Sequence, residues 1–90
     1  MDGQQQRKAL SAAESAIRAL AAGEAGRARD AAEKAASLDQ IGVYGGFAGW
    51  VRRAAGEVET LGGVLPETRE ALADSLGGGP LAAAVDAWLG

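Results

Sequence analysis

The sequence predicts a small all-α domain, a bundle in which an antiparallel helical hairpin packs against about three further helices. Three observations lead to this fold class. Apolar residues recur at spacings of three and four in several segments, as they do on one face of a helix. Glycine pairs, a glycine triplet and the two prolines separate these segments. Alanine, the best helix former, accounts for 22 of the 90 residues. We therefore expect residues 1–90 to form a single helical domain.

The predicted hairpin spans residues 9–38, after a polar lead-in over residues 1–8 that we expect to be frayed. Its first helix carries one apolar stripe: Leu10, Ala13, Ile17 and Leu20. Gly23 is suited to the left-handed conformation that ends a helix. The second helix has a mostly alanine inner face, which lets two backbones approach closely: Ala28, Ala31, Ala32, Ala35 and Leu38. A loop this short joins antiparallel neighbours.

This hairpin resembles a tetratricopeptide repeat, most clearly in the repeat's second half. Three features match the turn, the small helix-contact positions and the closing pair of that family: Gly23, Ala28 with Ala35, and Leu38 with Asp39. The resemblance spans residues 9–40 at its widest. It implies a hairpin of the kind with which repeat proteins build binding surfaces.

Residues 43–61 predict a third helix. Its larger apolar residues fall on a single face: Val43, Phe47, Trp50, Val51, Ala54, Val58 and Leu61. Four glycines in this stretch oppose the prediction, because each costs about 1 kcal/mol relative to alanine inside a helix. The helix must recover that cost by packing, or begin irregularly near Gly46.

The glycines of the third helix lie opposite its apolar face, among charged residues. Such a smooth strip would let another backbone come close while the charges set its orientation, so we propose it as a candidate partner-binding surface: Gly45, Gly49, Arg52, Arg53 and Gly56. Accumulation of glycine on an unselected solvent face is the alternative, and the sequence leaves both open.

Two short helices are expected at the C-terminal end, over residues 66–76 and 80–89. Pro66 and Pro80 each suit a first helical turn, and glycines precede and separate the two segments. Asp74-Ser75-Leu76 is similar to the signature with which acyl carrier proteins present a serine. Only 15 residues follow Ser75, so we expect a helix end there and no carrier serine.

The composition argues against catalysis, metal binding and cofactor binding. The absence of His and Cys removes imidazole bases, thiolate nucleophiles and most zinc sites. A net charge of −3 disfavours nucleic-acid binding, and Arg52 and Arg53 beside Trp50 and Tyr44 are too few for a single-strand site. We expect acidic pairs such as Glu57 with Glu59 to be solvated helix surface. The uncharged stretch over residues 40–51 is too short to cross a membrane.

We therefore expect a non-catalytic protein–protein interaction module that binds a protein partner or associates with itself. A small secreted helical-hairpin substrate of a bacterial export system is the alternative, although Gly49-Trp50-Val51 lacks the Trp-x-Gly turn of those proteins. Richness in Ala, Gly and Arg points to a GC-rich bacterial source, and the lack of a signal peptide to the cytoplasm.

Overall fold

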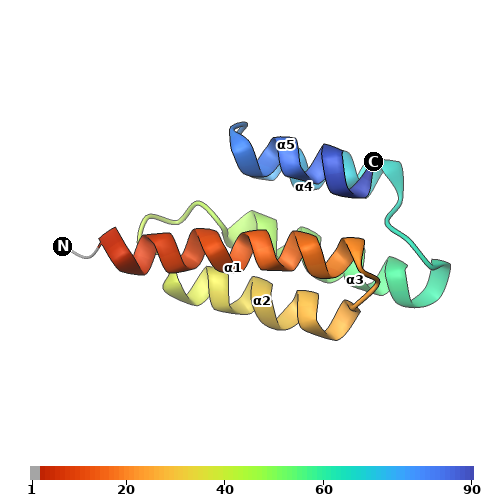
Figure 1. Ribbon diagram of the computed structural model, residues 1–90, viewed down its shortest axis with the longest axis horizontal. Helices are drawn as coiled ribbons and strands as arrows, with labels where there is room; N and C mark the ends of the chain where they lie inside the picture. Colours follow the sequence, from red (N-terminus) through yellow and green to blue (C-terminus); the bar gives the residue numbers. More distant parts are fainter. Residues whose placement is uncertain (1–2) are drawn as a thin grey trace.

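The computed structural model describes residues 3–90, and these form five helices (Figure 1). In chain order they are α1 (Gly3–Ala21), α2 (Ala25–Leu38), α3 (Gly45–Leu61), α4 (Pro66–Ser75) and α5 (Pro80–Leu89). The α1 and α2 helices form the expected antiparallel hairpin, and three further helices complete the all-α bundle. The molecule measures 42 × 23 × 17 Å, and α1 runs along its long axis (Figure 1).

The bundle consists of a three-helix body and a helical hairpin packed along one side of it (Figure 1). The body is formed by α1, α2 and α3, and α3 packs mainly on α2. The α4–α5 hairpin contacts the body through α5 on α1 and α4 on α3 (Figure 1). None of the helices in the described range is long and apolar enough to cross a membrane.

Two helix starts differ from the predicted positions, by six residues in α1 and by two in α3, where the alternative start near Gly46 is one residue away. The α1 helix begins at Gly3, so the segment expected to fray is helical from there; its first two residues lie outside the described range. This turn is held because Gln6 exchanges hydrogen bonds with the loop after α2. The α3 helix begins at Gly45, which leaves Val43 in that loop and not on the apolar face of α3.

Alanine packs the α1–α2 hairpin. Seven residues of α1 are buried, five of them alanine, and all four buried residues of α2 are alanine: Ala25, Ala28, Ala32 and Ala35. Gly23 has φ +76° in the turn between the helices, the left-handed conformation predicted for it. The expected stripe is correct for Ala13, Ile17 and Leu20, but Leu10 is 49% exposed.

Larger side chains fill the space between the body and the α4–α5 hairpin. Phe47 and Val51 of α3 are fully buried, as are Leu72 of α4 and Val85 of α5. Leu61 was expected on the same face as Phe47, but it is 62% exposed because α3 extends past its neighbours at this end.

The turns around α4 and α5 follow the sequence prediction. Both helices begin at their prolines, and α4 ends at Ser75, whose hydroxyl donates a 2.7 Å hydrogen bond to the Leu72 carbonyl. Three consecutive glycines with positive φ, residues 77–79, then reverse the chain into α5.

Candidate binding surface

The loop between α2 and α3 is organised around one carboxylate, that of Asp39. Its Oδ1 accepts hydrogen bonds from the backbone N–H groups of Ile41 (3.2 Å) and Gly42 (3.0 Å), and its Oδ2 accepts one from Tyr44 N–H (2.6 Å). Gln6 of α1 donates a further bond of 3.1 Å to Oδ1. Partial burial alone would raise the pKa of Asp39, but these hydrogen bonds outweigh it and hold the pKa below its ordinary value.

This loop carries two large aliphatic side chains on its outer side. Ile41 is 71% exposed and Val43 is 45% exposed, although the backbone that bears them is tied to Asp39 on the inner side. Gln6 also accepts a 2.9 Å bond from the Gln40 N–H, which fastens the loop to α1. The two aliphatic groups are therefore held out toward solvent by a fixed backbone.

Val43 forms one wall of an apolar groove with a volume of about 210 Å³. The groove lies where the α2–α3 loop and the α4–α5 turn meet over the N-terminal half of α1 (Figure 1). Seven residues from these three parts line it: Leu10, Val43, Tyr44, Leu76, Gly78, Pro80 and Leu81. Small-molecule sites commonly have volumes of about 300–1,000 Å³. This groove is smaller and suits a protruding side chain better than a whole cofactor.

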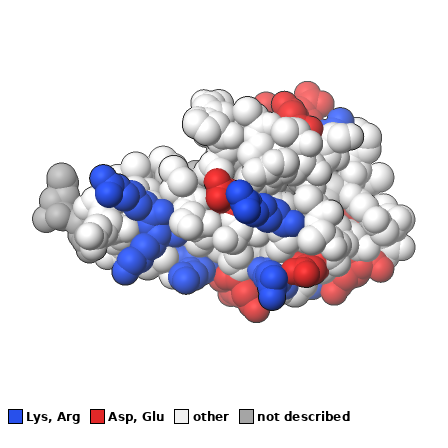
Figure 2. All heavy atoms as spheres, in the orientation of Figure 1, with Lys and Arg blue, Asp and Glu red and all other residues white. Residues whose placement is uncertain are grey.

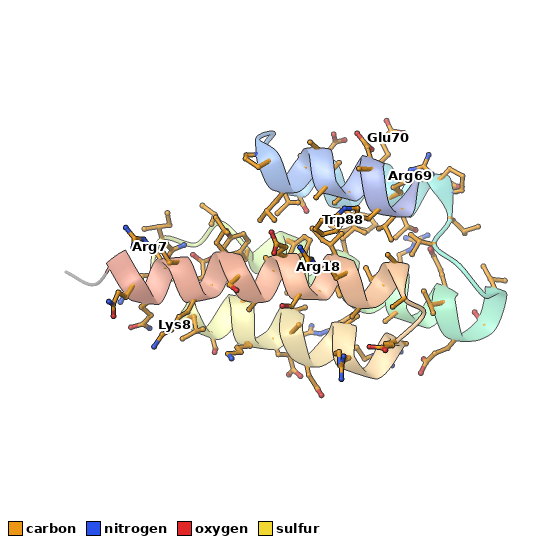
Figure 3. The ribbon with its side chains drawn as sticks, in the orientation of Figure 1. Arg7, Lys8, Arg18, Arg69, Glu70 and Trp88 are labelled. Carbon is orange, nitrogen blue, oxygen red and sulfur yellow. The ribbon has the colours of Figure 1, made fainter. Side chains whose placement is uncertain are left out.

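The α1 side of the groove carries charges of both signs. Arg7 precedes Leu10 by three residues and Glu14 follows it by four, so both lie on the helix face that carries Leu10. Lys8 lies on the opposite side of α1 from Arg7 (Figure 3), where it lines a hollow with Ala31 and Lys34 of α2. On the face shown in Figure 2, Lys and Arg gather over the N-terminal end of α1 with no Asp or Glu among them.

The five residues of the predicted glycine strip lie together along the outer side of α3. Gly45, Gly49, Arg52 and Arg53 are exposed, and Gly56 is half-buried. A Cβ added at any of the three glycines would meet nothing within 4 Å. The Arg53 guanidinium also lies 5.6 Å from the centre of the Trp50 ring. Trp50 is inside α3 and not at a turn between helices.

Glu57 was expected on the solvated surface of the third helix, but the structure buries it. It is 8% exposed, and its carboxylate accepts hydrogen bonds from the Leu65 N–H (2.9 Å) and the Thr68 hydroxyl (2.7 Å), with Arg53 Nε at 3.4 Å. Burial raises the pKa of Glu57, but the bonds from Thr68, Leu65 and Arg53 lower it by more, so the net shift is downward. Glu57 thus joins the start of α4 to α3.

The neighbouring Glu59 is exposed, as predicted, and is paired with Arg29 of α2. The two distances between guanidinium nitrogens and carboxylate oxygens are 3.1 and 2.5 Å. Arg29 lowers the pKa of Glu59, and this hydrogen bond is the largest cause of the shift. Within residues 3–90 no three potential ligands gather in a position to hold a metal ion.

Sequence reasoning missed the groove and the anchoring role of Glu57. A signal for each was present. Asp39 precedes Gly42, and an aspartate at the head of a turn often accepts hydrogen bonds from the following backbone. Glu57 falls only about 20° outside the predicted apolar arc of the third helix, when each residue is taken to turn the helix by about 100°. A charge at such an edge is a candidate for contact with the next element.

Comparisons with known proteins found no match to a family model, to a curated protein or to a solved structure.

Proposed function

We propose that this chain is a non-catalytic protein–protein interaction module. The observation that carries the proposal is the group of large aliphatic side chains held in water by the α2–α3 loop and α1: Leu10, Ile41 and Val43. Complete burial of one such side chain contributes about 1.5–3 kcal/mol. Covering the exposed part of all three would therefore contribute several kcal/mol to binding. Leu10 and Val43 line the same groove, and exposed apolar surface of this kind marks interaction sites.

The carboxylates with shifted pKa values stabilise the fold and do not resemble catalytic groups. The carboxylates with shifted pKa values, Asp39, Glu57 and Glu59, each bind groups of the fold itself. Their pKa values are lowered, whereas a general acid or base near neutral pH needs a raised carboxyl pKa. The resemblance of residues 9–40 to a tetratricopeptide repeat also supports the proposal, because that family uses helix pairs as binding scaffolds. We infer that α1 and α2 serve as such a scaffold here.

The glycine strip is a second candidate surface for the same function. Its exposed position on α3 favours it, since another backbone could lie against Gly45 and Gly49 without meeting a side chain. Arg52 and Arg53 would then orient the partner. This surface and the groove can be tested separately, because different residues form them and a crosslinker can be placed on each.

Photo-crosslinking in the cells that make the protein tests the function. A benzophenone amino acid would replace Val43 at the groove, Gly49 on the strip, or the exposed Glu33 of α2 as a control. We expect a discrete protein adduct from position 43 or 49 and none from position 33. The adduct mass distinguishes a second 9.0 kDa copy from another protein. If neither position 43 nor position 49 gives an adduct, the proposed function is wrong.

A further inference from the structure

We propose that a hollow between α1 and α2 binds the phosphate group of a small phosphate monoester. This inference goes beyond the proposed function, because the hollow shares no residue with the apolar groove or with the glycine strip. The hollow has a volume of about 270 Å³, and both helices of the hairpin line it: Lys8, Ser11, Ala12, Ser15, Ala31 and Lys34.

Both lysines of the chain line this hollow, whereas the remaining basic residues are arginines. Lys8 lies in the first half of α1 and points toward α2, and Lys34 lies in the last turns of α2 (Figure 3). Lysine binds phosphate oxygens as a compact charge on a flexible stem. The antiparallel hairpin therefore brings two cations that are distant in sequence to the walls of one hollow.

Neither lysine forms an ion pair with a carboxylate of residues 3–90. Asp30 precedes Lys34 by one turn of α2, but it does not line the hollow and no ion pair joins the two. A second hollow follows along the same side of α1 and α2, and there each cation is already paired: Arg18 with Glu14 at 3.5 Å and Arg27 with Glu24 at 3.1 Å. Positive charge is therefore available to an anion at the first hollow, whereas carboxylates of the fold already neutralise it at the second.

The hollow also contains the two serine hydroxyls that the fold does not use. Ser11 and Ser15 lie one turn apart on α1, and within residues 3–90 neither hydroxyl makes a hydrogen bond. The other serine and threonine hydroxyls of the chain all donate to groups of the fold: Ser37, Thr60, Thr68 and Ser75. A phosphate group has three strong acceptor oxygens, so it can receive hydrogen bonds from hydroxyls and ammonium groups together.

The charge and the size of the hollow favour a small phosphate monoester over other anions. A monoester carries about two negative charges above its second pKa of about 6, which matches two lysines, whereas a carboxylate carries one. A nucleic-acid strand carries one charge on each phosphate and is bound by longer basic tracks than two lysines provide. The volume of about 270 Å³ lies just below the usual range for small-molecule sites, so the hollow can hold the phosphate and few further atoms.

Titration of the full chain with phenyl phosphate, followed in NMR spectra, tests the site. We expect saturable shifts at the backbone amides of the residues that line the hollow. Lys8→Gln/Lys34→Gln should raise the dissociation constant about tenfold, because it removes two charge-assisted hydrogen bonds from the exposed walls. Arg27→Gln/Arg52→Gln removes the same charge from exposed positions elsewhere and should change the constant less than about twofold. Equal losses for the two double variants would mean that binding follows net charge alone, and would overturn the inference.

The hydroxyls and the charge of the ligand are tested in the same titration. Ser11→Ala/Ser15→Ala removes no hydrogen bond of the fold and should raise the dissociation constant about fivefold. Ser37→Ala, whose hydroxyl bonds to the Lys34 carbonyl at 3.2 Å, is the control and should leave it unchanged. Phenyl sulfate has a similar shape but a single charge, so at pH 8 it should bind about fivefold more weakly than phenyl phosphate. Equal affinity for the two ligands, or no effect of the serine substitutions, would overturn the phosphate assignment.

Sedimentation with vesicles that contain phosphatidic acid distinguishes a soluble ligand from a lipid headgroup, since both present a phosphate monoester. We expect the protein to stay in the supernatant, because its net charge of −3 opposes binding to an anionic surface. Sedimentation with the vesicles that Lys8→Gln/Lys34→Gln abolishes would overturn the small ligand and assign the hollow to a membrane lipid.

Discussion

The three-helix body and the α4–α5 hairpin achieve their packing by different physical means. Among the described residues, all twelve buried alanines lie in α1, α2 and α3, and none lies in α4 or α5. The buried apolar side chains of the α4–α5 hairpin are larger: Leu72, Leu81 and Val85. A methyl group buries little area by itself, so the body depends on the close approach of its backbones.

Polar groups hold the two regions in place differently as well. In the body, the Asp39 network fixes a loop and the Arg29–Glu59 pair joins α2 to α3 at the surface. The attachment of α4 is buried: Thr68 is 1% exposed and bonds to the Glu57 carboxylate. A change of side-chain size should therefore destabilise the body most. Loss of the Glu57 carboxylate should instead weaken the attachment of α4 and α5.

The substitution Ala32→Glu should have the largest effect. Ala32 is 1% exposed on α2, and a glutamate there would bring both excess volume and an unpaired charge between α1 and α2. We expect a loss of several kcal/mol in the free energy of unfolding, enough to unfold so small a domain. Circular dichroism during heating measures this.

The control for Ala32→Glu is Ser11→Glu, which places the same side chain on the exposed side of α1. Its melting temperature should stay near that of the wild type. A melting temperature for Ala32→Glu within a few degrees of the wild type would show that the alanine seam is not closely packed.

Loss of the Glu57 carboxylate should loosen the α4–α5 hairpin and spare the body. Glu57→Ala leaves the Thr68 hydroxyl and the Leu65 N–H without their acceptor, which costs about 2–3 kcal/mol. Hydrogen exchange should accelerate in α4 and α5 more than in α1 and α2. Glu59→Ala on the exposed side of the same helix should change exchange far less. Uniform acceleration in all helices for Glu57→Ala would mean that the two regions unfold as one unit.

Acid should weaken the same attachment. Because the folded-state pKa of Glu57 is lowered, its contribution to stability is fully present above the unfolded-state pKa of about 4.3 and is lost as the pH falls through the folded-state pKa. The Leu65 amide proton, bonded to Glu57 Oε1 at 2.9 Å, should report this titration in NMR spectra. In Glu57→Gln that transition should disappear, while the Asp39 transition seen at Tyr44 N–H persists. An unchanged Leu65 titration in the variant would contradict the assignment.

The comparison also explains which parts of the fold the sequence could predict. Helix ends are set by local rules, and Gly23, Pro66 and Pro80 therefore marked them correctly. The buried side of α1 was predicted too narrow because the prediction followed the larger residues of the helix, whereas the structure buries α1 widely against α2, α5 and α3. Alanine suits both buried and exposed positions, so its pattern could not reveal that width, and Leu10 was assigned to the core.

The groove could not be predicted, because three distant segments form it only after the α4–α5 hairpin is in place. Val43 was included in the third helix because its spacing fitted the apolar face. The Asp39 carboxylate instead satisfies the backbone N–H groups of residues 41, 42 and 44, and the helix starts only at Gly45. Four of the five residues of the glycine strip lie on exposed helix surface as predicted, and Gly56 is half-buried; their position depends on helical periodicity alone.

The double variant Gly45→Ala/Gly49→Ala should have the smallest effect. It distinguishes a glycine strip that contacts a partner from glycines that accumulated on an unselected surface. Gly45 and Gly49 both have space for a Cβ and neither has a positive φ. Gly45→Ala/Gly49→Ala should therefore raise the free energy of unfolding by up to about 1 kcal/mol per site. Gly23→Ala should lower it, since the φ of +76° there is strained for any side chain. Thermal melts of the two variants measure both changes.

What the stabilised variant then binds decides the role of α3. The benzophenone amino acid is placed at position 53 here, because position 49 now carries alanine. If the glycines accumulated by drift, crosslinking from position 53 should be absent, or unchanged by the two added methyl groups. If a partner backbone lies on the strip, the same methyl groups should push it away, and the crosslinking yield should fall in a protein that melts at a higher temperature. Stability and binding moving in opposite directions is the signature of a contact surface, because a defect in folding would lower both together. A destabilised Gly45→Ala/Gly49→Ala would contradict the open space on α3 and remove the strip as a binding surface.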